Sequence, residues 1–180
     1  MRGPIGGGRR GAARTVADNH SFDIVSEVNT AEMHNAVVQA QHELAVRYDF
    51  KGTRAAIDYN KKDNTLTLLA DHKGQLEVVI QLLKEKMARR GVAVGALKRG
   101  KIEEASHDSV RETLSLHQGI DTDSAKKMVK QIKGLGLKVQ SQILENKLRV
   151  TGKKKDELQA VIAYLKEHGP EFPLQFTNFT

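Results

Sequence analysis

The chain has 180 residues, of which 39% are hydrophobic and 28% charged, a composition typical of a globular protein with one ordinary domain or two small ones. It has no cysteine, which excludes disulfides, thiolate metal sites and a cysteine nucleophile, and it fits a reducing cytoplasm. No apolar run is long enough to cross a membrane, and the net charge of +7 favours an anionic partner.

Residues 1–20 are rich in glycine and arginine and carry four arginines against one aspartate. Such a segment cannot bury enough apolar surface to order itself, so we exclude it from the fold. It is either a disordered arm that touches nucleic acid or, as we favour, a leader or an over-long start.

The next elements follow from periodicity. Alternation in residues 21–28 predicts a strand with one buried face. Asn29 followed by Glu32 is typical of a helix N-terminus, and the helix should run to about Tyr48. Its apolar stripe consists of Met33, Ala36, Val37, Ala40 and Leu44.

Lys51-Gly52 predicts a chain reversal, and two alternating stretches around a polar turn at 61–64 predict a hairpin. A second amphipathic helix should end near Gly91, followed by an extended stretch to about Glu104. The first half therefore has the order β-α-β-β-α-β.

The second half repeats this order, with Lys133-Gly134 as the corresponding reversal. Residues 64–85 and 146–167, which are 82 positions apart, share nine identities in 22 positions. The matches include Lys-Glu pairs that shared secondary structure alone does not require, so we infer a tandem duplication.

The predicted fold is α+β, with two tandem ferredoxin-like βαββαβ units, each an antiparallel four-stranded sheet with helices on one face. We place the first unit at residues 21–104 and the second at 105–180. The uncovered sheet faces are surfaces on which nucleic-acid bases could stack.

Catalytic and metal-binding patterns are missing from the sequence. The seven histidines form no HExxH or comparable spacing, and neither GxSxG nor GxxxxGK[ST] occurs. We therefore expect no enzyme activity, no cofactor and no metal.

Cationic side chains near glycines and aromatic rings favour binding instead. "VRYDFKGTR" at 46–54 places cations beside Tyr48 and Phe50, and residues 121–155 hold ten Lys/Arg against three Asp/Glu. The alternative is that the rings belong to the core and the cations are solvated. The predicted nucleotide-binding residues are Arg47, Tyr48, Phe50, Lys51, Gly52, Arg54, Arg99, Lys101, Lys133, Arg149 and Lys153.

The motifs "SFDIVSEVN", "YDFKGTRAAID", "HQGIDTDSAKKMVKQIK", "LKVQSQI", "LRVTGKKKDELQAVI" and "LQFTNF" occur in the order found in the YajQ family of small bacterial nucleotide-binding proteins. The chain resembles this family from Ser21 to Thr180. The resemblance implies N-terminal strands exchanged between the two units. It also implies binding of nucleotides or RNA, with cyclic di-GMP sensing and effects on gene expression in some members, and no established enzyme activity.

Two functions follow as hypotheses. The first is a cytoplasmic, non-enzymatic protein that binds a nucleotide, a cyclic dinucleotide or RNA and has a regulatory role. The alternative is an adaptor that acts on a transcription regulator through its open sheets or the surfaces between its units.

Overall fold

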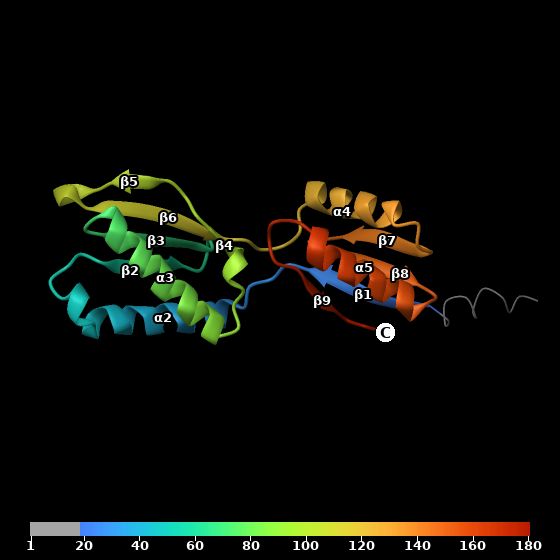
Figure 1. Cartoon of the computed structure of the whole chain (residues 1–180), viewed down its shortest axis with the longest axis horizontal. Coiled ribbons are helices and arrows are strands. Elements are labelled where there is room, and N and C mark those ends of the chain that lie inside the picture. The colour runs from blue at the N-terminus through green and yellow to red at the C-terminus, as the bar shows by residue number, and fades with distance from the viewer. Residues whose placement is uncertain (1–18) are drawn as a thin grey trace, which may run out of the picture. The chain divides into compact units, whose positions relative to one another are not determined.

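The structure is a computed structural model that describes residues 19–180; the predictions for residues 1–18 lie outside the described residues. The chain divides into two compact units. Unit 2 comprises Ser26–Gln118 and Glu171–Pro173, and unit 1 comprises the rest of the described chain. Figure 1 shows the course of the chain.

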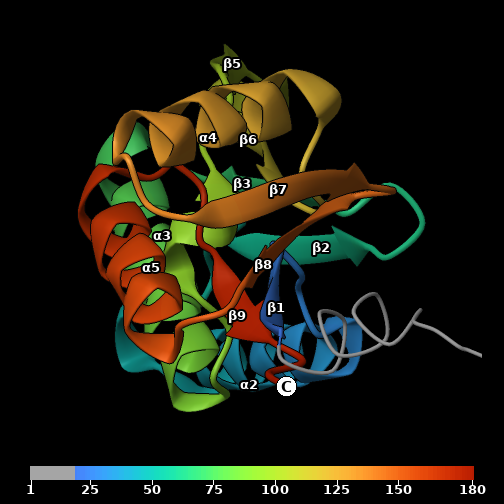
Figure 2. The same cartoon turned by 90° about the vertical axis from the view of Figure 1, so that its right-hand side faces the viewer.

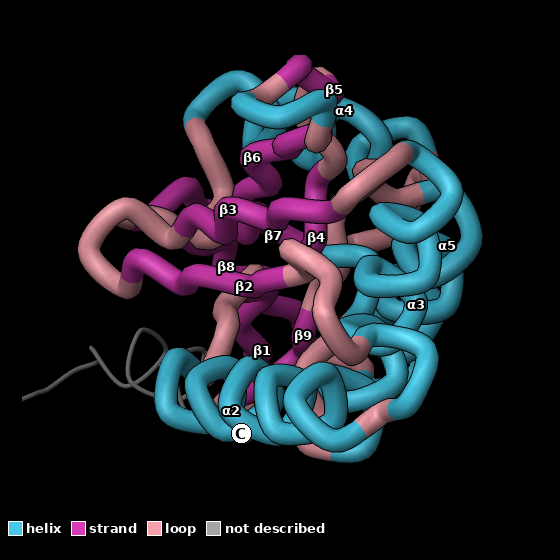
Figure 3. The backbone as a smooth tube through the Cα atoms, turned by 90° about the vertical axis from the view of Figure 1, so that its left-hand side faces the viewer, coloured by secondary structure: helices cyan, strands magenta, loops and turns pink. Residues whose placement is uncertain are grey.

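Unit 2 contains the helices α2 (Thr30–Val46) and α3 (Lys73–Arg89) and one antiparallel sheet in the order β2-β3-β6-β4. A further short strand, β5, also pairs with β6. Both helices cover the same face of the sheet (Figure 3). The strands are β2 (Ala56–Asn60), β3 (Thr65–Ala70), β4 (Leu97–Lys98), β5 (Ile102–Glu104) and β6 (Val110–Leu116).

Unit 1 contains α4 (Thr122–Gly134) and α5 (Lys155–His168) and an antiparallel sheet in the order β7-β8-β1-β9. The two helices pack on one face of this sheet (Figure 2). The strands are β1 (His20–Val25), β7 (Val139–Leu144), β8 (Lys147–Gly152) and β9 (Gln175–Thr177).

Each sheet has the strand order of the ferredoxin-like fold, so the predicted fold class is confirmed. The first strand, however, is exchanged in both units. β1 pairs with β8 and β9, whereas β6 takes the corresponding place between β3 and β4. The units therefore do not follow the expected division at residue 104, because each first strand pairs in the sheet that contains the other unit's hairpin.

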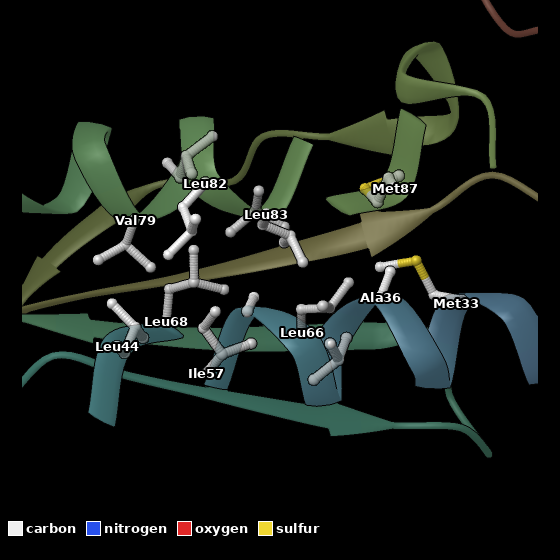
Figure 4. Packing of buried hydrophobic residues seen from close by; sticks show 14 of the residues in the cluster. Met33, Ala36, Leu44, Ile57, Leu66, Leu68, Val79, Leu82, Leu83 and Met87 are labelled. Carbon is white, nitrogen blue, oxygen red and sulfur yellow. The ribbon is translucent and has the colours of Figure 1, made fainter. Parts of the chain in front are cut away.

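The core of unit 2 shows why the helices form where the sequence predicts them. The α2 stripe predicted from helical spacing is buried against β3 and α3, as Figure 4 shows for Met33, Ala36 and Leu44. Leu66 and Leu68 on β3 are fully buried beneath them. Burying side chains of this size contributes roughly 1.5–3 kcal/mol each, so packing on this face stabilises the unit.

The ends of the helices agree with most sequence signals. The Asn29 side chain accepts a hydrogen bond from the Glu32 amide, and Asp121 accepts one from the Ser124 amide. The reversal after α4 lies later than predicted. Gly134 is still helical, whereas Gly136 has a φ of +71°, the conformation that only glycine adopts easily.

Candidate functional site

The eleven predicted binding residues divide between the two units. Lys133, Arg149 and Lys153 belong to unit 1, and the other eight belong to unit 2. Each unit therefore has candidate binding residues of its own.

The "FKGT" motif does line a cavity in unit 2. Phe50, Lys51, Gly52 and Thr53 form one side of a cavity of about 460 Å³ between the end of α2 and the start of β2. The rest of its wall is largely apolar and comes from Gln41, Leu44, Ala45, Ala55, Ala56 and Ile57. Lys51 is exposed and is the only cation among the described residues that line it, so this cavity can take an apolar group with a single negative charge.

The aromatic and arginine side chains of the same motif have other environments. Phe50 is buried, whereas Tyr48 is 89% exposed. The Arg47 guanidinium binds both carboxylate oxygens of Asp49 at 2.9 and 3.0 Å and lies 5.3 Å from the centre of the Phe50 ring. Arg54 donates to the carbonyl of His107 at 2.8 Å. Lys51 is thus the cation of this group most available to a ligand.

Arg99 is held by two acids of its own unit. Its Nε lies 2.6 Å from Oε2 of Glu112, whose side chain is fully buried, and its Nη2 lies 2.7 Å from Oε1 of Glu77. The hydrogen bond to Glu112, followed by that to Glu77, raises the pKa of Arg99. The geometry therefore gives Arg99 a structural role, in contrast to the predicted phosphate contact. Lys101 nearby is exposed.

In unit 1, Arg149 is likewise paired with a buried carboxylate, that of Asp23. Asp23 on β1 is 1% exposed, and it accepts hydrogen bonds from Arg149 at 2.8 Å, Lys147 at 3.0 Å and Asn178 at 2.8 Å. These donors, Arg149 first, outweigh burial and hold the pKa of Asp23 well below its usual range. This cluster joins β1, β8 and the C-terminal segment.

A cationic hollow lies at one end of the unit 1 sheet. A cavity of about 480 Å³ is lined by Lys138, Lys153 and Lys154, together with Asn19, Gln140, Thr151, Gly152 and Glu157. We call it the lysine cavity. Its three lysines are exposed, and no hydrogen bond or ion pair holds their amines within residues 19–180. Three cations against the single carboxylate of Glu157 favour a phosphate-bearing ligand.

Strand pairing brings these residues together from distant parts of the sequence. β1 pairs with β8 so that His20 faces Gly152, which places Asn19 beside the loop that begins at Lys153. β8 also pairs with β7, where Val139 faces Gly152 and follows Lys138. Gly152 is buried, and an added Cβ would lie 3.1 Å from Val139 and 3.3 Å from Leu158, so a side chain there would be crowded.

In unit 2, the residues equivalent to Lys153 and Lys154 form hydrogen bonds with a neighbouring side chain and amide. The residues 82 positions earlier are Asp71 and His72, ahead of α3. His72 Nδ1 accepts from the Gln75 amide at 3.1 Å, and Gln75 Oε1 accepts from the Asp71 amide at 2.7 Å. By contrast, Lys154 makes no side-chain cap for α5. The first turn of α5 therefore has no side-chain cap, and it contains Asp156 and Glu157, whose carboxylates interact favourably with the positive end of the helix.

Sequence reasoning found only part of this site. It selected Lys153 from the "KKK" run but did not select Asn19, Lys138, Gln140 or Lys154. The lysine run was visible in the sequence. The positions of Asn19 and Lys138 depend on the β1-β8-β7 pairing, which has no local signal. Lys133, which the prediction included, is exposed on α4 and does not line the cavity.

Metal-binding clusters and membrane-spanning helices are both missing from the part of the chain that the structure describes. No three histidine, aspartate or glutamate side chains there gather closely enough to hold a metal ion. None of the helices in the same range combines the length and apolar character needed to cross a membrane.

A comparison with family models identifies the chain. Residues 20–180 match the model described as nucleotide-binding protein YajQ-like. The chain belongs to the YajQ family. The match begins at the first residue of β1 and reaches the last residue of the chain, so both sheets of the YajQ fold lie within it.

Bacterial members of the YajQ family are similar over nearly their full length. A nucleotide-binding protein of Thioalkalivibrio sulfidiphilus is 50% identical over 88% of this chain and 98% of its own. Another, from Carboxydothermus hydrogenoformans, is 47% identical over 91% of this chain and 99% of its own. A third, from Magnetococcus marinus, is 48% identical over 88% and 98%. Their names specify nucleotide binding and no reaction.

Proposed function

We propose that this protein is a non-enzymatic nucleotide-binding protein of the bacterial cytoplasm, and that the phosphates of its ligand bind in the lysine cavity. The observation that carries the proposal is the convergence of Lys138, Lys153 and Lys154 on one hollow. Lysine amines bind phosphate as point charges, and three of them tolerate more than one phosphate group. The names of the YajQ relatives support a nucleotide as the ligand.

The polar side chains around the lysines have a role in the same site. Asn19, Gln140 and Thr151 carry amide and hydroxyl groups that can donate to and accept from a ribose or a base edge. The cavity volume of about 480 Å³ lies within the range of small-molecule sites. A nucleotide therefore matches both the charge and the size of the cavity.

The site contains three lysines, amides, a hydroxyl and the carboxylate of Glu157, groups that can bind the phosphates and polar edges of a nucleotide. We propose a regulatory output, in which the nucleotide, with cyclic di-GMP as one candidate, changes the affinity for a partner such as a transcription regulator. The adaptor hypothesis without a nucleotide stays a prediction.

Calorimetric titration of matched variants tests the site. The double variant Lys153→Gln and Lys154→Gln removes two cations that have no ion-pair partner in the described chain, so the fold should persist. We expect its affinity for GTP and for cyclic di-GMP to fall about tenfold or more, because a charge-assisted hydrogen bond contributes roughly 1.5–3 kcal/mol. Lys51→Gln, in the other cavity, is the control and should bind as the parent does.

The same titration can contradict the proposal in two ways. Loss of binding in Lys51→Gln, with the double variant unaffected, would move the site to the "FKGT" cavity. Absence of heat with either nucleotide in the parent protein would remove the nucleotide from the proposal and favour the adaptor hypothesis. Unchanged thermal unfolding of both variants would show that folding is not the cause.

A further inference from the structure

The "FKGT" cavity of unit 2 lies along an edge of the sheet. β2 is the first strand in the order β2-β3-β6-β4, so one of its sides pairs with β3, and no described strand pairs with the other side. Ala56 and Ile57 of β2 line the cavity together with Leu44 and Ala45 of α2. The cavity is therefore a groove between a helix and the unpaired side of an edge strand.

The backbone of β2 directs hydrogen-bonding groups to this unpaired side. The Ile57 carbonyl accepts a hydrogen bond from the side-chain amide of Gln41 at 2.7 Å, so it points away from β3 and toward α2. In an antiparallel ladder the N–H and C=O of one residue point to the same side, and successive residues alternate. The backbone groups of Tyr59 therefore share the unpaired side with those of Ile57, whereas Asp58 faces β3. Such an edge can pair with one more extended chain.

The side chains along the groove suit an apolar group. Leu44 and Ile57 are buried side chains of its wall, and both are labelled in Figure 4. Ala45 in the same wall is exposed. Next to it in the sequence, Val46 and Tyr48 are large hydrophobic residues that are 75% and 89% exposed. Exposed apolar side chains gathered around a hollow are typical of an interaction surface.

The loop before β2 adds two donors for an anion. The Lys51 and Thr53 amides donate to the carbonyls of Tyr48 and Phe50, but within residues 19–180 the Gly52 amide and the Lys51 amine have no hydrogen-bond partner. Gly52 has a φ of +72°, and an added Cβ would meet nothing within 4 Å, so the loop is open at this point. One ammonium group and one amide match the single charge of a carboxylate.

We propose that the "FKGT" cavity binds the C-terminal end of an extended peptide whose last residue is apolar. The terminal carboxylate binds Lys51 and Gly52, and the last side chain enters the cavity. The preceding residues pair with Ile57 and Tyr59 as an added strand, and a peptide N–H replaces the Gln41 amide at the Ile57 carbonyl. Because the carboxylate lies before the start of β2, the peptide runs antiparallel to β2.

This peptide site is separate from the proposed nucleotide site, because the lysine cavity belongs to unit 1. An extended peptide explains the three features of the groove together, namely the unpaired strand edge, the apolar wall and the pair of donors. A small apolar acid would use the wall and the donors but leave the strand edge unpaired.

Labelled peptides test the proposal with the full chain. The probes are six-residue peptides of alternating threonine and valine, which favour an extended backbone, ending in valine, leucine or phenylalanine. Each is made with a free terminal carboxylate and as the terminal amide, and fluorescence anisotropy measures binding. We expect saturable binding of at least one free acid. Its amide should bind about tenfold or more weakly, because charge-assisted hydrogen bonds are lost.

Three variants locate the site. Lys51→Gln should weaken the best peptide about tenfold or more, and Ala45→Glu should weaken it as well by placing a like charge in the wall. Lys98→Gln is the matched control, because Lys98 is an exposed lysine on β4 at the opposite edge of the same sheet. It removes the same charge and should bind as the parent does. All three variants should bind GTP as the parent does, so the peptide and nucleotide proposals can fail separately.

Amide hydrogen exchange tests the added strand. The best peptide should slow exchange of the Ile57 and Tyr59 amides and leave that of Asp58, which already faces β3, unchanged. Decanoate is the comparison, because it is an apolar carboxylate without backbone donors or acceptors. It should bind more weakly than the peptide and leave the Tyr59 amide unprotected.

Four results would overturn the proposal. They are equal affinities of the free acid and the amide, parent affinity in Lys51→Gln, and no binding of any of the peptides up to about 1 mM. The fourth is decanoate that binds as tightly as the best peptide while neither ligand protects Tyr59. That result would assign the cavity to a small apolar acid.

Discussion

At the scale of single residues, two buried carboxylates show how this sequence uses charge. Glu112 on β6 is fully buried and is matched by Arg99 and by the amide of Gly100 at 3.1 Å. Asp23 on β1 is matched by Arg149, Lys147 and Asn178. A buried carboxylate without donors is costly, so these arginines are tied to the fold before any ligand is considered.

Removing Arg99 should therefore destabilise the protein. We expect Arg99→Ala to lower the free energy of unfolding by about 3 kcal/mol, because it leaves the Glu112 carboxylate buried with fewer donors. Denaturant unfolding measures the loss. Glu77→Gln is the matched control, since Glu77 is half exposed and its pair with Arg99 should contribute less than about 1 kcal/mol. Equal effects of the two substitutions would contradict the structural role of the buried pair.

At the scale of elements, the helices and strands follow closely from the sequence. The stripes of α2 and α3, the cap at Asn29 and the polar turn between β2 and β3 each produce the element that their local pattern predicts. These signals work because they act between residues close in sequence. Local patterns hold no information on which sheet a strand joins. The exchange of the first strands was therefore predicted only from the resemblance to a family.

The candidate site shows the same limit. Charge and glycine patterns found Lys51 and Lys153, and both do line cavities. The same patterns also selected Arg99 and Arg149, whose acid partners are distant in sequence or on another strand. A cation that is free to bind a ligand and one that holds a buried acid look alike in sequence, so the structure was needed to separate them.

The glycines at the end of α4 give a prediction at this scale. Gly134 lies in the helix with open space around its Cα, so Gly134→Ala should stabilise the protein by about 0.5–1 kcal/mol. Gly136 has space as well, but its positive φ should make Gly136→Ala destabilising by a similar amount or more. Thermal unfolding of the two variants measures the opposite signs. Two shifts of the same sign would show that backbone conformation does not separate these positions.

At the scale of the whole molecule, the exchange of strands means that the two compact units do not correspond to two successive stretches of sequence. Nearly all of unit 2 is one continuous stretch, Ser26–Gln118, whereas unit 1 is assembled from segments on both sides of it. The stretch 21–104, expected from sequence, contains β1, which pairs in the other sheet, and lacks β6. Its β3 would lose the strand that pairs with it over Thr65–Ala70.

Fragments test this division. A fragment of residues 26–118 should fold cooperatively, because it contains β2, β3, β4, β5 and β6 with both covering helices. It should be less stable than the full chain, since it lacks Phe172, which stacks on His117 at 3.9 Å. A fragment of residues 21–104 should give no cooperative unfolding transition. Circular dichroism during heating distinguishes the two fragments. Cooperative unfolding of the fragment 21–104 would show that the sheet does not need β6 as the partner of β3.

The pairing of β1 has a consequence for synthesis on the ribosome. β1 ends at Val25, and its partner β8 does not begin until Lys147, about 120 residues later. At roughly 5–20 residues per second, β1 waits on the order of ten seconds for a partner. During that time α2, α3 and β6 are all made, so the continuous stretch Ser26–Gln118 of unit 2 is made before β8. The nascent strand "HSFDIV" is then an unpaired apolar segment, and the interval is one in which a chaperone that binds extended chains would find it.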